Sequence, residues 1–316
     1  MRNSSIDITK GIGIIAVVFF HFVNLDRLMY FYEWGGYVTT IYMSLFFLLS
    51  GLFYKPNRLG ERIKRLILPY LSFLVIGFLI YAIKEYIKDS PIEWGKLYMP
   101  LCGNGRECAN PPIWFLLALM EIIIINHIIY NYSSKRWRYF IIIAVSIGGF
   151  YMSSYGNPYS VGTAMLCSIF FFLGKEWKKF FIGEQSTWSY WAAFAISILL
   201  YVYNMGYTNV STNFIPVGYV PFILISILAT YSCVGLSKWI DCKFPKMKFI
   251  LCWLGENSLA IMLTHLFFIS IQDKIITLHL SIYLTMSASL LVVMIIDSAF
   301  VLVINKYAKF LLGKQH

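Results

Sequence analysis

The residues best suited to chemistry lie along the first apolar segment, residues 8–29. Asp7, Lys10, His21 and Asn24 occupy positions that share one face of a helix with 3.6 residues per turn. If Lys10 lies at a membrane surface, His21 lies about 16 Å deeper, near the midplane. Ionisable side chains are unfavourable at that depth and therefore mark functional sites. We predict that His21 takes a proton from a hydroxyl group. The alternative is that His21 has only a structural role in helix packing.

A second histidine occupies a comparable position in the ninth apolar segment, residues 254–272. Asn257 and Ser258 are expected to cap the start of that helix, and Ser258 shares a face with His265. His265 is then expected about 16 Å into the membrane, at a depth like that of His21. Two histidines that reach one depth from different helices indicate a shared site, and coincidence is the alternative.

The fourth apolar segment, residues 112–130, carries a tryptophan and a carboxylate on one face. Trp114 and Glu121 are seven residues apart, which corresponds to two helical turns. Glu121 falls within the span and is expected to need a histidine or arginine partner. Trp114 is expected either at the site or as an anchor at the membrane interface.

A basic loop follows the second apolar segment and contains Arg62, Lys64 and Arg65. Arg62 and Arg65 lie on one face of a helical turn, and paired guanidinium groups bind phosphate with two parallel hydrogen bonds. The alternative is a cluster that only anchors a cytoplasmic loop. Gly51, just before this loop, is expected to end its helix or to allow close helix packing.

The cysteines give no metal-binding pattern. No CxxC pair and no histidine-rich spacing is present, so no metal site is expected. Cys102 and Cys108 flank a short loop expected to face outward. A disulfide between them and two free thiols are both open, because the sequence does not give their geometry.

These side chains must be positioned by membrane-spanning helices. Hydrophobic residues make up 59% of the 316 residues and charged residues only 13%, which is typical of an integral membrane protein. Spans need roughly 17–25 apolar residues each. The sequence predicts an all-α, polytopic chain with about ten spans, near 8–29, 36–54, 66–84, 112–130, 138–156, 161–175, 187–204, 217–236, 254–272 and 281–305.

The distribution of cations supports this division. With ten spans and both termini in the cytoplasm, 20 of the 26 lysines and arginines fall on the inner side. The net charge of +11 therefore indicates orientation and contact with membrane lipids, and nucleic-acid binding is not expected. The first segment lacks a small-residue cleavage site and is expected to be retained. No gap is long enough for a soluble domain, so residues 1–316 are expected to form one membrane domain.

Five segments together resemble the membrane acyltransferase 3 family, and within it the branch related to fucose 4-O-acetylases. The order and spacing of these segments carry the resemblance more than any one of them does. They are the Asp, basic residue and His of 2–21, the FFLLSG run within 43–51, the RIKR run and proline of 62–69, the WFL of 114–116, and LGENSL followed by His in 254–265. One departure is that Tyr42 and Ser44 stand where many members have His and Pro.

The resemblance implies transfer of an acyl group, usually acetyl, from cytoplasmic acetyl-CoA to a hydroxyl of a cell-envelope or lipid-linked saccharide, by an enzyme of the cell membrane. It implies His21 as the general base or a transient acyl carrier. Lys10 is expected to orient the thioester or balance charge, Asp7 to fix Lys10, and His265 to bind or polarise the acceptor. Arg62 and Arg65, with Lys64, are expected to hold the CoA phosphates. The expected acceptor-binding residues are Asn24, Trp114, Glu121, Asn257 and Ser258.

Two other classes of function remain open. One is a transporter or flippase for a glycan or small acid, in which His21, Glu121 and His265 form a proton relay. The other is a non-catalytic scaffold in glycan assembly. A basic pair at the inner end of a histidine-bearing helix favours the acyltransferase, because a transporter needs no phosphate site there. Homo-oligomers are compatible with all three classes.

Overall fold

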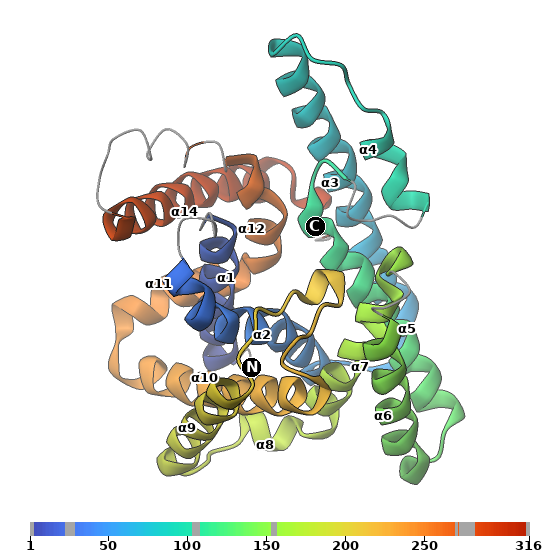
Figure 1. The fold of residues 1–316 in the computed structure, drawn as a ribbon, viewed down its shortest axis with the longest axis vertical. Coiled ribbons are helices and arrows are strands. Elements are labelled where there is room, and N and C mark those ends of the chain that lie inside the picture. Colours follow the sequence, from blue (N-terminus) through green and yellow to red (C-terminus); the bar gives the residue numbers. More distant parts are fainter. Residues whose placement is uncertain are drawn as a thin grey trace.

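The computed structural model describes residues 3–22, 29–102, 108–152, 157–268, 271 and 282–313. Within these ranges the chain is helical, as predicted (Figure 1). The extended pairing found there is an isolated antiparallel bridge between Asn209 and Phe214. The all-α fold class follows from long apolar runs, since a backbone in lipid must satisfy its hydrogen bonds within the segment.

The longer helices are separated by short 3-10 turns. The α-helices are α1 Ser4–Phe22, α2 Met29–Leu52, α3 Leu59–Ile87, α4 Gly95–Tyr98, α5 Trp114–Tyr132, α6 Lys135–Tyr151, α7 Val161–Glu176, α8 Lys178–Ile182, α9 Thr187–Tyr203, α10 Tyr219–Lys243, α11 Pro245–Glu256, α12 Ser258–Thr264 and α14 Ile282–Tyr307. The 3-10 turns are η2 Pro56–Arg58, η3 Met99–Cys102, η4 Pro111–Ile113, η6 Pro158–Ser160, η7 Val210–Thr212, η8 His265–Phe268 and η9 Lys309–Leu312.

Each of the ten predicted spans has a helical counterpart, but the helices differ in length. In the described part of the chain, six helices are long and apolar enough to cross a membrane, namely α1, α2, α3, α5, α10 and α14. Helices α11 and α12 form a seventh candidate that is bent by 63°. Helices α6, α7 and α9 have 17, 16 and 17 residues and lie at or just below the lower limit for a span. The chain is therefore a multi-pass membrane protein, and the number ten stays a prediction.

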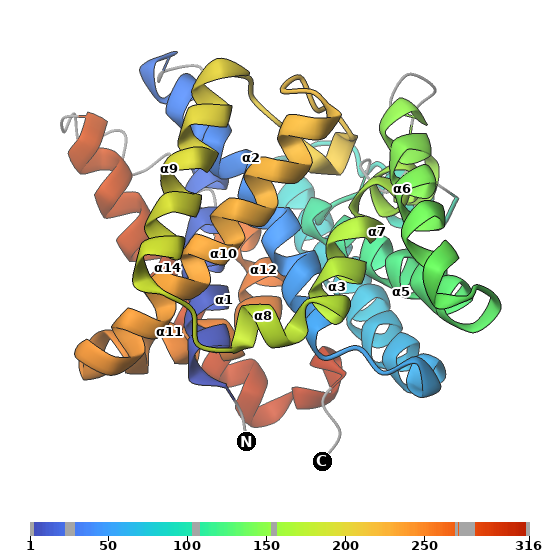
Figure 2. The same cartoon turned by 90° about the horizontal axis from the view of Figure 1, so that it is seen from below.

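Both ends of the chain lie on one face of the helix assembly (Figure 2). The same face carries α8, α11 and the start of α3 (Figure 2). This arrangement is the one that an even number of crossings produces. We refer to this face as the inner face, because the predicted excess of lysine and arginine assigns it to the cytoplasm.

Small residues let α1 and α11 approach at backbone distance. A Cβ atom on Gly255 would lie 1.8 Å from the carbonyl oxygen of Asp7, and one on Gly11 would lie 2.2 Å from that of Leu251. Any larger side chain would push the two helices apart, as is typical of glycine contacts between helices in membranes. The predicted chemical face of α1 is thereby fixed against the first half of the broken helix pair.

Helices α2 and α7 are also packed closely through glycines. A Cβ atom on Gly51 would lie 2.0 Å from the carbonyl oxygen of Phe171, and one on Gly174 would lie 2.0 Å from that of Leu48. Of the two roles predicted for Gly51, close packing is the one found. Helix α2 also contacts α1 and α10, so it links the two halves of the assembly (Figure 1).

Candidate functional site

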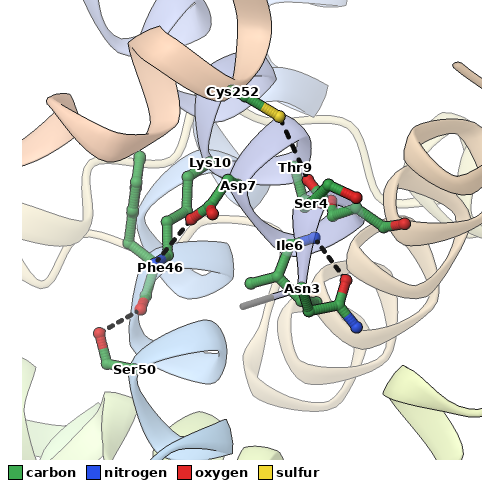
Figure 3. A network of polar contacts seen from close by, with 10 residues as sticks. Asn3, Ser4, Ile6, Asp7, Thr9, Lys10, Phe46, Ser50 and Cys252 are labelled. Atoms are coloured by element: carbon green, nitrogen blue, oxygen red, sulfur yellow. Dashed lines mark hydrogen bonds and ion pairs between the residues drawn. The ribbon is translucent and has the colours of Figure 1, made fainter. Parts of the chain in front are cut away.

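An ion pair lies at the inner end of α1. Lys10 Nζ is 3.8 Å from Asp7 Oδ1, and the Asp7 residue is only 5% exposed. Figure 3 shows this pair beside Phe46 and Ser50 of α2. The spacing predicted that Asp7 would hold Lys10, and this contact is present. Helical rise places Lys10 about 16 Å from His21 along the axis, so the ion pair lies apart from the histidine.

Polar contacts fix the inner end of α1 against α10 and α11. Ser4 Oγ donates a hydrogen bond of 2.7 Å to Asp241 Oδ2, and Lys248 Nζ pairs with Asp241 Oδ1 at 2.8 Å. One turn deeper, Thr9 Oγ1 donates to Ser237 Oγ at 2.9 Å. Because buried polar groups in membranes are satisfied across helices, these contacts determine the rotation of α1 about its axis.

The two predicted histidines meet. The ring centroids of His21 and His265 are 4.9 Å apart, and the rings are inclined by 72° in an edge-to-face arrangement. His21 lies in the last turn of α1, and His265 begins η8 directly after α12. His265 is fully buried, whereas His21 is exposed beside it. The pair therefore has one accessible ring and one enclosed ring.

Hydrogen bonding determines which ring nitrogen of each histidine can accept a proton. His21 Nδ1 is 2.8 Å from the carbonyl oxygen of Val17, and His265 Nδ1 is 3.0 Å from that of Ile261. A carbonyl oxygen only accepts, so Nδ1 carries the proton in both neutral rings. Each Nε2 then presents a lone pair. His265 Nε2 is buried and has no partner among the described residues, which leaves it open to a donor such as a hydroxyl.

Helix α14 holds the broken pair of helices at two points. Thr264 Oγ1 donates to Asp297 Oδ1 at 2.5 Å, next to His265. Asn305 Nδ2 donates to Asn257 Oδ1 at 2.7 Å, at the break itself. These two bonds position η8 and hence the ring of His265. The position of Asp297 near the inner end of its apolar segment favours a structural role, and the bond with Thr264 fits that prediction.

The predicted capping by Asn257 and Ser258 is wrong. Asn257 stands at the N-cap position of α12 but makes no side-chain capping bond. Its Nδ2 atom donates instead to the carbonyl oxygen of Trp253 at 2.9 Å, which also accepts the backbone N–H of Asn257 at 3.1 Å. Asn257 and Ser258 are both buried at the break. Their predicted role in acceptor binding stays a prediction.

Asn110 is a residue that sequence reasoning missed. It is 1% exposed, and its Nδ2 atom donates to the carbonyl oxygen of Leu263 at 3.0 Å. Asn110 directly precedes η4 and the start of α5, so it ties the beginning of α5 to α12. The Pro111-Pro112 pair that follows is the sequence signal for a defined turn here.

The other predicted acceptor-binding residues are dispersed. Trp114 begins α5 and packs edge-on against Phe115, with ring centroids 6.2 Å apart. Glu121 is half-buried, and its Oε2 atom has no hydrogen-bond partner within the described ranges, so the predicted histidine or arginine partner is not found there. Asn24 lies outside the described residues.

The three predicted phosphate-binding residues do not converge. Arg62 is half-buried, donates through Nη2 to the carbonyl oxygen of Phe53, and places Cζ 5.2 Å from the ring centroid of Tyr54. Lys64 and Arg65 are both exposed. Arg62 therefore turns toward the end of α2, and its immediate neighbours there are aromatic.

A cavity of about 830 Å³ lies between α1, α2, α9 and α10. Its lining is mostly apolar and includes Ile12, Ala16 and Tyr42. The residues predicted to do chemistry are absent from that lining, so the cavity is separate from the histidine pair. Tyr42 stacks on Phe20 with ring centroids 6.5 Å apart. At this position, where the family resemblance implies a histidine, the tyrosine suits an apolar wall.

A disulfide between Cys102 and Cys108 and two free thiols were the alternatives for the outward loop. In the structure the thiol of Cys108 is free. Cys108 is buried and unbonded, and the segment 103–107 beside it lies outside the described residues. Within the part of the chain that is described, three or more histidine, cysteine, aspartate or glutamate side chains do not gather as they would around a metal ion.

Comparison with known proteins assigns the chain to a family. The acyltransferase 3 family model, whose description is an acyltransferase domain, matches residues 3–302. No curated protein and no solved structure matches the chain. The match covers the first-helix histidine, the basic loop and the broken helices together, and it confirms the family predicted from the short segments. The chain belongs to the acyltransferase 3 family and is a multi-pass membrane acyltransferase.

Proposed function

We propose that the protein is an O-acetyltransferase that moves an acetyl group from cytoplasmic acetyl-CoA to a hydroxyl of a cell-envelope or lipid-linked saccharide. The observation that carries the proposal is the histidine pair. His21 and His265 each anchor Nδ1 on a carbonyl oxygen and leave Nε2 as an acceptor, with ring centroids 4.9 Å apart. A hydroxyl that donates to Nε2 becomes a nucleophile as its proton is removed.

The reaction is direct transfer with His21 as general base. His21 Nε2 takes the proton of the acceptor hydroxyl while its oxygen bonds to the thioester carbonyl carbon. The carbon–sulfur bond then breaks, and the resulting imidazolium returns the proton to the leaving thiolate of CoA. His265, buried beside this ring, accepts a hydrogen bond from the acceptor and orients it. We favour direct transfer over a transient acyl-histidine because the two rings differ in exposure. The exposed ring of His21 suits proton transfer, and the buried ring of His265 suits orientation of the acceptor.

The donor enters from the inner face. Arg62, at the junction of α2 and α3, binds phosphate groups of CoA, and the pantetheine arm runs along the polar face of α1 toward His21. Lys10 and Asp7 lie on that route as a fixed ion pair and position the arm by charge. Helical rise makes the route about 16 Å long, so a long flexible arm is required to bring the thioester to the histidine.

The acceptor approaches from the side of the histidine pair that faces away from the inner end. Trp114, Glu121 and Asn24 are the proposed contacts to its sugar ring, together with Asn257 and Ser258 near the break. Aromatic rings and carboxylates suit a saccharide, because one offers an apolar face and the other accepts from hydroxyls. The resemblance of the sequence to the branch related to fucose 4-O-acetylases supports a 6-deoxy sugar as the first acceptor to examine.

A transporter is the second candidate. Glu121 and Asp297 each retain a buried oxygen with no hydrogen-bond partner among the described residues, a feature also found in proton relays. Membership of an acyltransferase family favours the enzyme, because a transporter needs neither a thioester nor a phosphate site.

The test is acetyl transfer by the purified protein in detergent. Acetyl-CoA carrying a labelled acetyl group is supplied with a panel of lipid-linked saccharides, and both CoA thiol release and labelled product are measured. Wild type is expected to release thiol and label a saccharide, and His21→Ala is expected to do neither. Absence of acetyl-CoA binding by wild type would refute the proposal and leave the transporter as the reading to pursue.

A further inference from the structure

The close packing of α2 and α7 brings two residues together that no prediction had paired. Gly51 and Gly174 hold the helices at backbone contact near the inner face. Tyr54 comes soon after Gly51, and Lys175 comes directly after Gly174. The two side chains consequently meet just beyond the end of α2, beside Arg62 in the first turn of α3.

Two cations stand over two tyrosine rings at this point. Lys175 Nζ is 5.3 Å from the ring centroid of Tyr54 and 3.3 Å from that of Tyr130. Arg62 Cζ is 5.2 Å from the Tyr54 centroid. The two rings are themselves 5.9 Å apart. Cation–aromatic contacts of this kind hold the charged groups in place without neutralising them.

The hydroxyl of Tyr54 is buried and has no hydrogen-bond partner among the described residues, and Tyr54 as a whole is 5% exposed. An unpaired buried donor is unfavourable, and native structures rarely keep one without a reason. The ends of the Arg62 and Lys175 side chains lie over this ring. The unpaired hydroxyl therefore belongs to a ring that carries two cations.

The charge around the hydroxyl is positive. Arg138 lies near the second ring, with Cζ 4.9 Å from the Tyr130 centroid. The carboxylate nearby is Glu176, and it already accepts a hydrogen bond of 2.6 Å from the Tyr130 hydroxyl. In the described part of the chain, neither Arg62 nor Lys175 forms an ion pair with a carboxylate. The cluster therefore combines a donor without a partner and two cations without a direct ion pair, although Glu176 is an acidic neighbour of Lys175.

We infer that Tyr54, Arg62 and Lys175 form a binding site for one phosphate group of the nucleotide part of the acyl donor. Tyr54 donates a hydrogen bond to a phosphate oxygen, while Arg62 and Lys175 balance its charge. This inference rests on the proposed function, in which the donor is acetyl-CoA. It replaces Lys64 and Arg65, which are exposed, with Tyr54 and Lys175.

A neighbouring aromatic ring favours a nucleotide over a lipid headgroup. Phe53 is 43% exposed at the rim of the site, and Lys178 Nζ is 5.2 Å from its ring centroid. A nucleobase stacks on such an exposed ring, whereas a phospholipid headgroup has no aromatic group to place there. The adjacent residues Phe53 and Tyr54 would then contact the base and the phosphate, respectively.

The experiment measures binding of adenosine 3′,5′-bisphosphate, which has the base and phosphates but no thioester. Equilibrium binding to the purified full chain in detergent is compared for wild type, Tyr54→Phe and Lys175→Gln. Both variants are expected to weaken binding about tenfold or more, because each removes a hydrogen bond or charge from the phosphate. Lys179→Gln is the matched control, since it removes the same charge from an exposed position on α8 and is expected to bind as wild type. Unchanged thermal unfolding of Tyr54→Phe shows that the fold is retained.

Four outcomes decide the inference. Wild-type affinity in both variants would overturn it, as would a wild type that binds short-chain phosphatidylglycerol but not the bisphosphate. Equal weakening by Lys179→Gln would reduce the effect to general surface charge and would also overturn it. Bisphosphate binding that depends on Tyr54 and Lys175, in a protein that transfers no acetyl group, would support the site while refuting the proposed function.

Discussion

The His21 and His265 rings face each other edge to face at 4.9 Å, and each is held through Nδ1 by the carbonyl oxygen one turn earlier in its own helix. The two rings thus have the same tautomer but different surroundings. Local helical geometry sets the direction of each lone pair, and contact between distant helices sets the distance between them.

The first prediction concerns His265. His265→Ala is expected to lower kcat for acetyl transfer about a hundredfold, because general acid–base and orienting groups contribute roughly 10²–10⁴-fold. Thiol release is measured under saturating acetyl-CoA. His127→Ala is the control, since His127 bonds only to Asn131 near the inner end of α5 and is expected to leave kcat unchanged. Equal losses in both variants would contradict the assignment.

The second prediction concerns Arg62. Arg62→Gln is expected to raise the KM for acetyl-CoA about tenfold with a smaller change in kcat, because it removes a charge from donor binding rather than from the reacting atoms. Arg58 lies in the same loop, is exposed and pairs with Glu61 at 3.7 Å. Arg58→Gln changes the net charge equally and is expected to keep the wild-type KM. An effect confined to kcat would argue against phosphate binding by Arg62.

The third prediction concerns the contact between α1 and α11. Gly255→Ala is expected to destabilise the protein by about 1–3 kcal/mol, because the added Cβ would lie 1.8 Å from the Asp7 carbonyl oxygen and the helices must separate. Thermal unfolding in detergent measures the loss. Gly60→Ala is the control, since nothing lies within 4 Å of a Cβ there and alanine favours the helix. Gly60→Ala is expected to raise the unfolding temperature slightly or leave it unchanged.

The fourth prediction concerns the bond between Thr264 and Asp297. Thr264→Val is expected to destabilise the protein by about 1–3 kcal/mol, because it leaves the buried carboxyl group of Asp297 without its donor. Asp297→Asn retains an oxygen that can accept from Thr264, so it is expected to cost less. Unfolding temperatures of the two variants provide the comparison. A larger loss for Asp297→Asn would show that the negative charge, rather than the hydrogen bond, holds the broken helix.

The sequence predicted the features that depend on local spacing. The positions of Asp7, Lys10 and His21 along one helix face follow from a repeat of 3.6 residues, and so does the contact of Asp7 with Lys10 within one turn. Gly51 was correctly associated with close packing because a small residue at the end of an apolar run has few other uses. These features need no knowledge of which helices are neighbours.

The features that depend on distant partners were not predictable in this way. The bend at Asn257 lies where the sequence predicts only the start of a span, and it is stabilised by Asn305 from another helix. Arg62 and Arg65 appear equivalent in the sequence, yet only Arg62 is turned toward the aromatic end of α2. Asn110 acts through Leu263, which lies far along the chain. One sequence does not identify such pairs.

The two hydrogen bonds that join α14 to the broken helices have a consequence for biosynthesis. During translation, α1 is synthesised well before α14. Until α14 arrives, Asn257 and Thr264 lack the partners that hold the bend, so His265 is not yet aligned with His21. Nascent chains that stop before α14 would therefore not consume acyl donor. Maturation of the reaction centre is coupled in this way to the synthesis of α14.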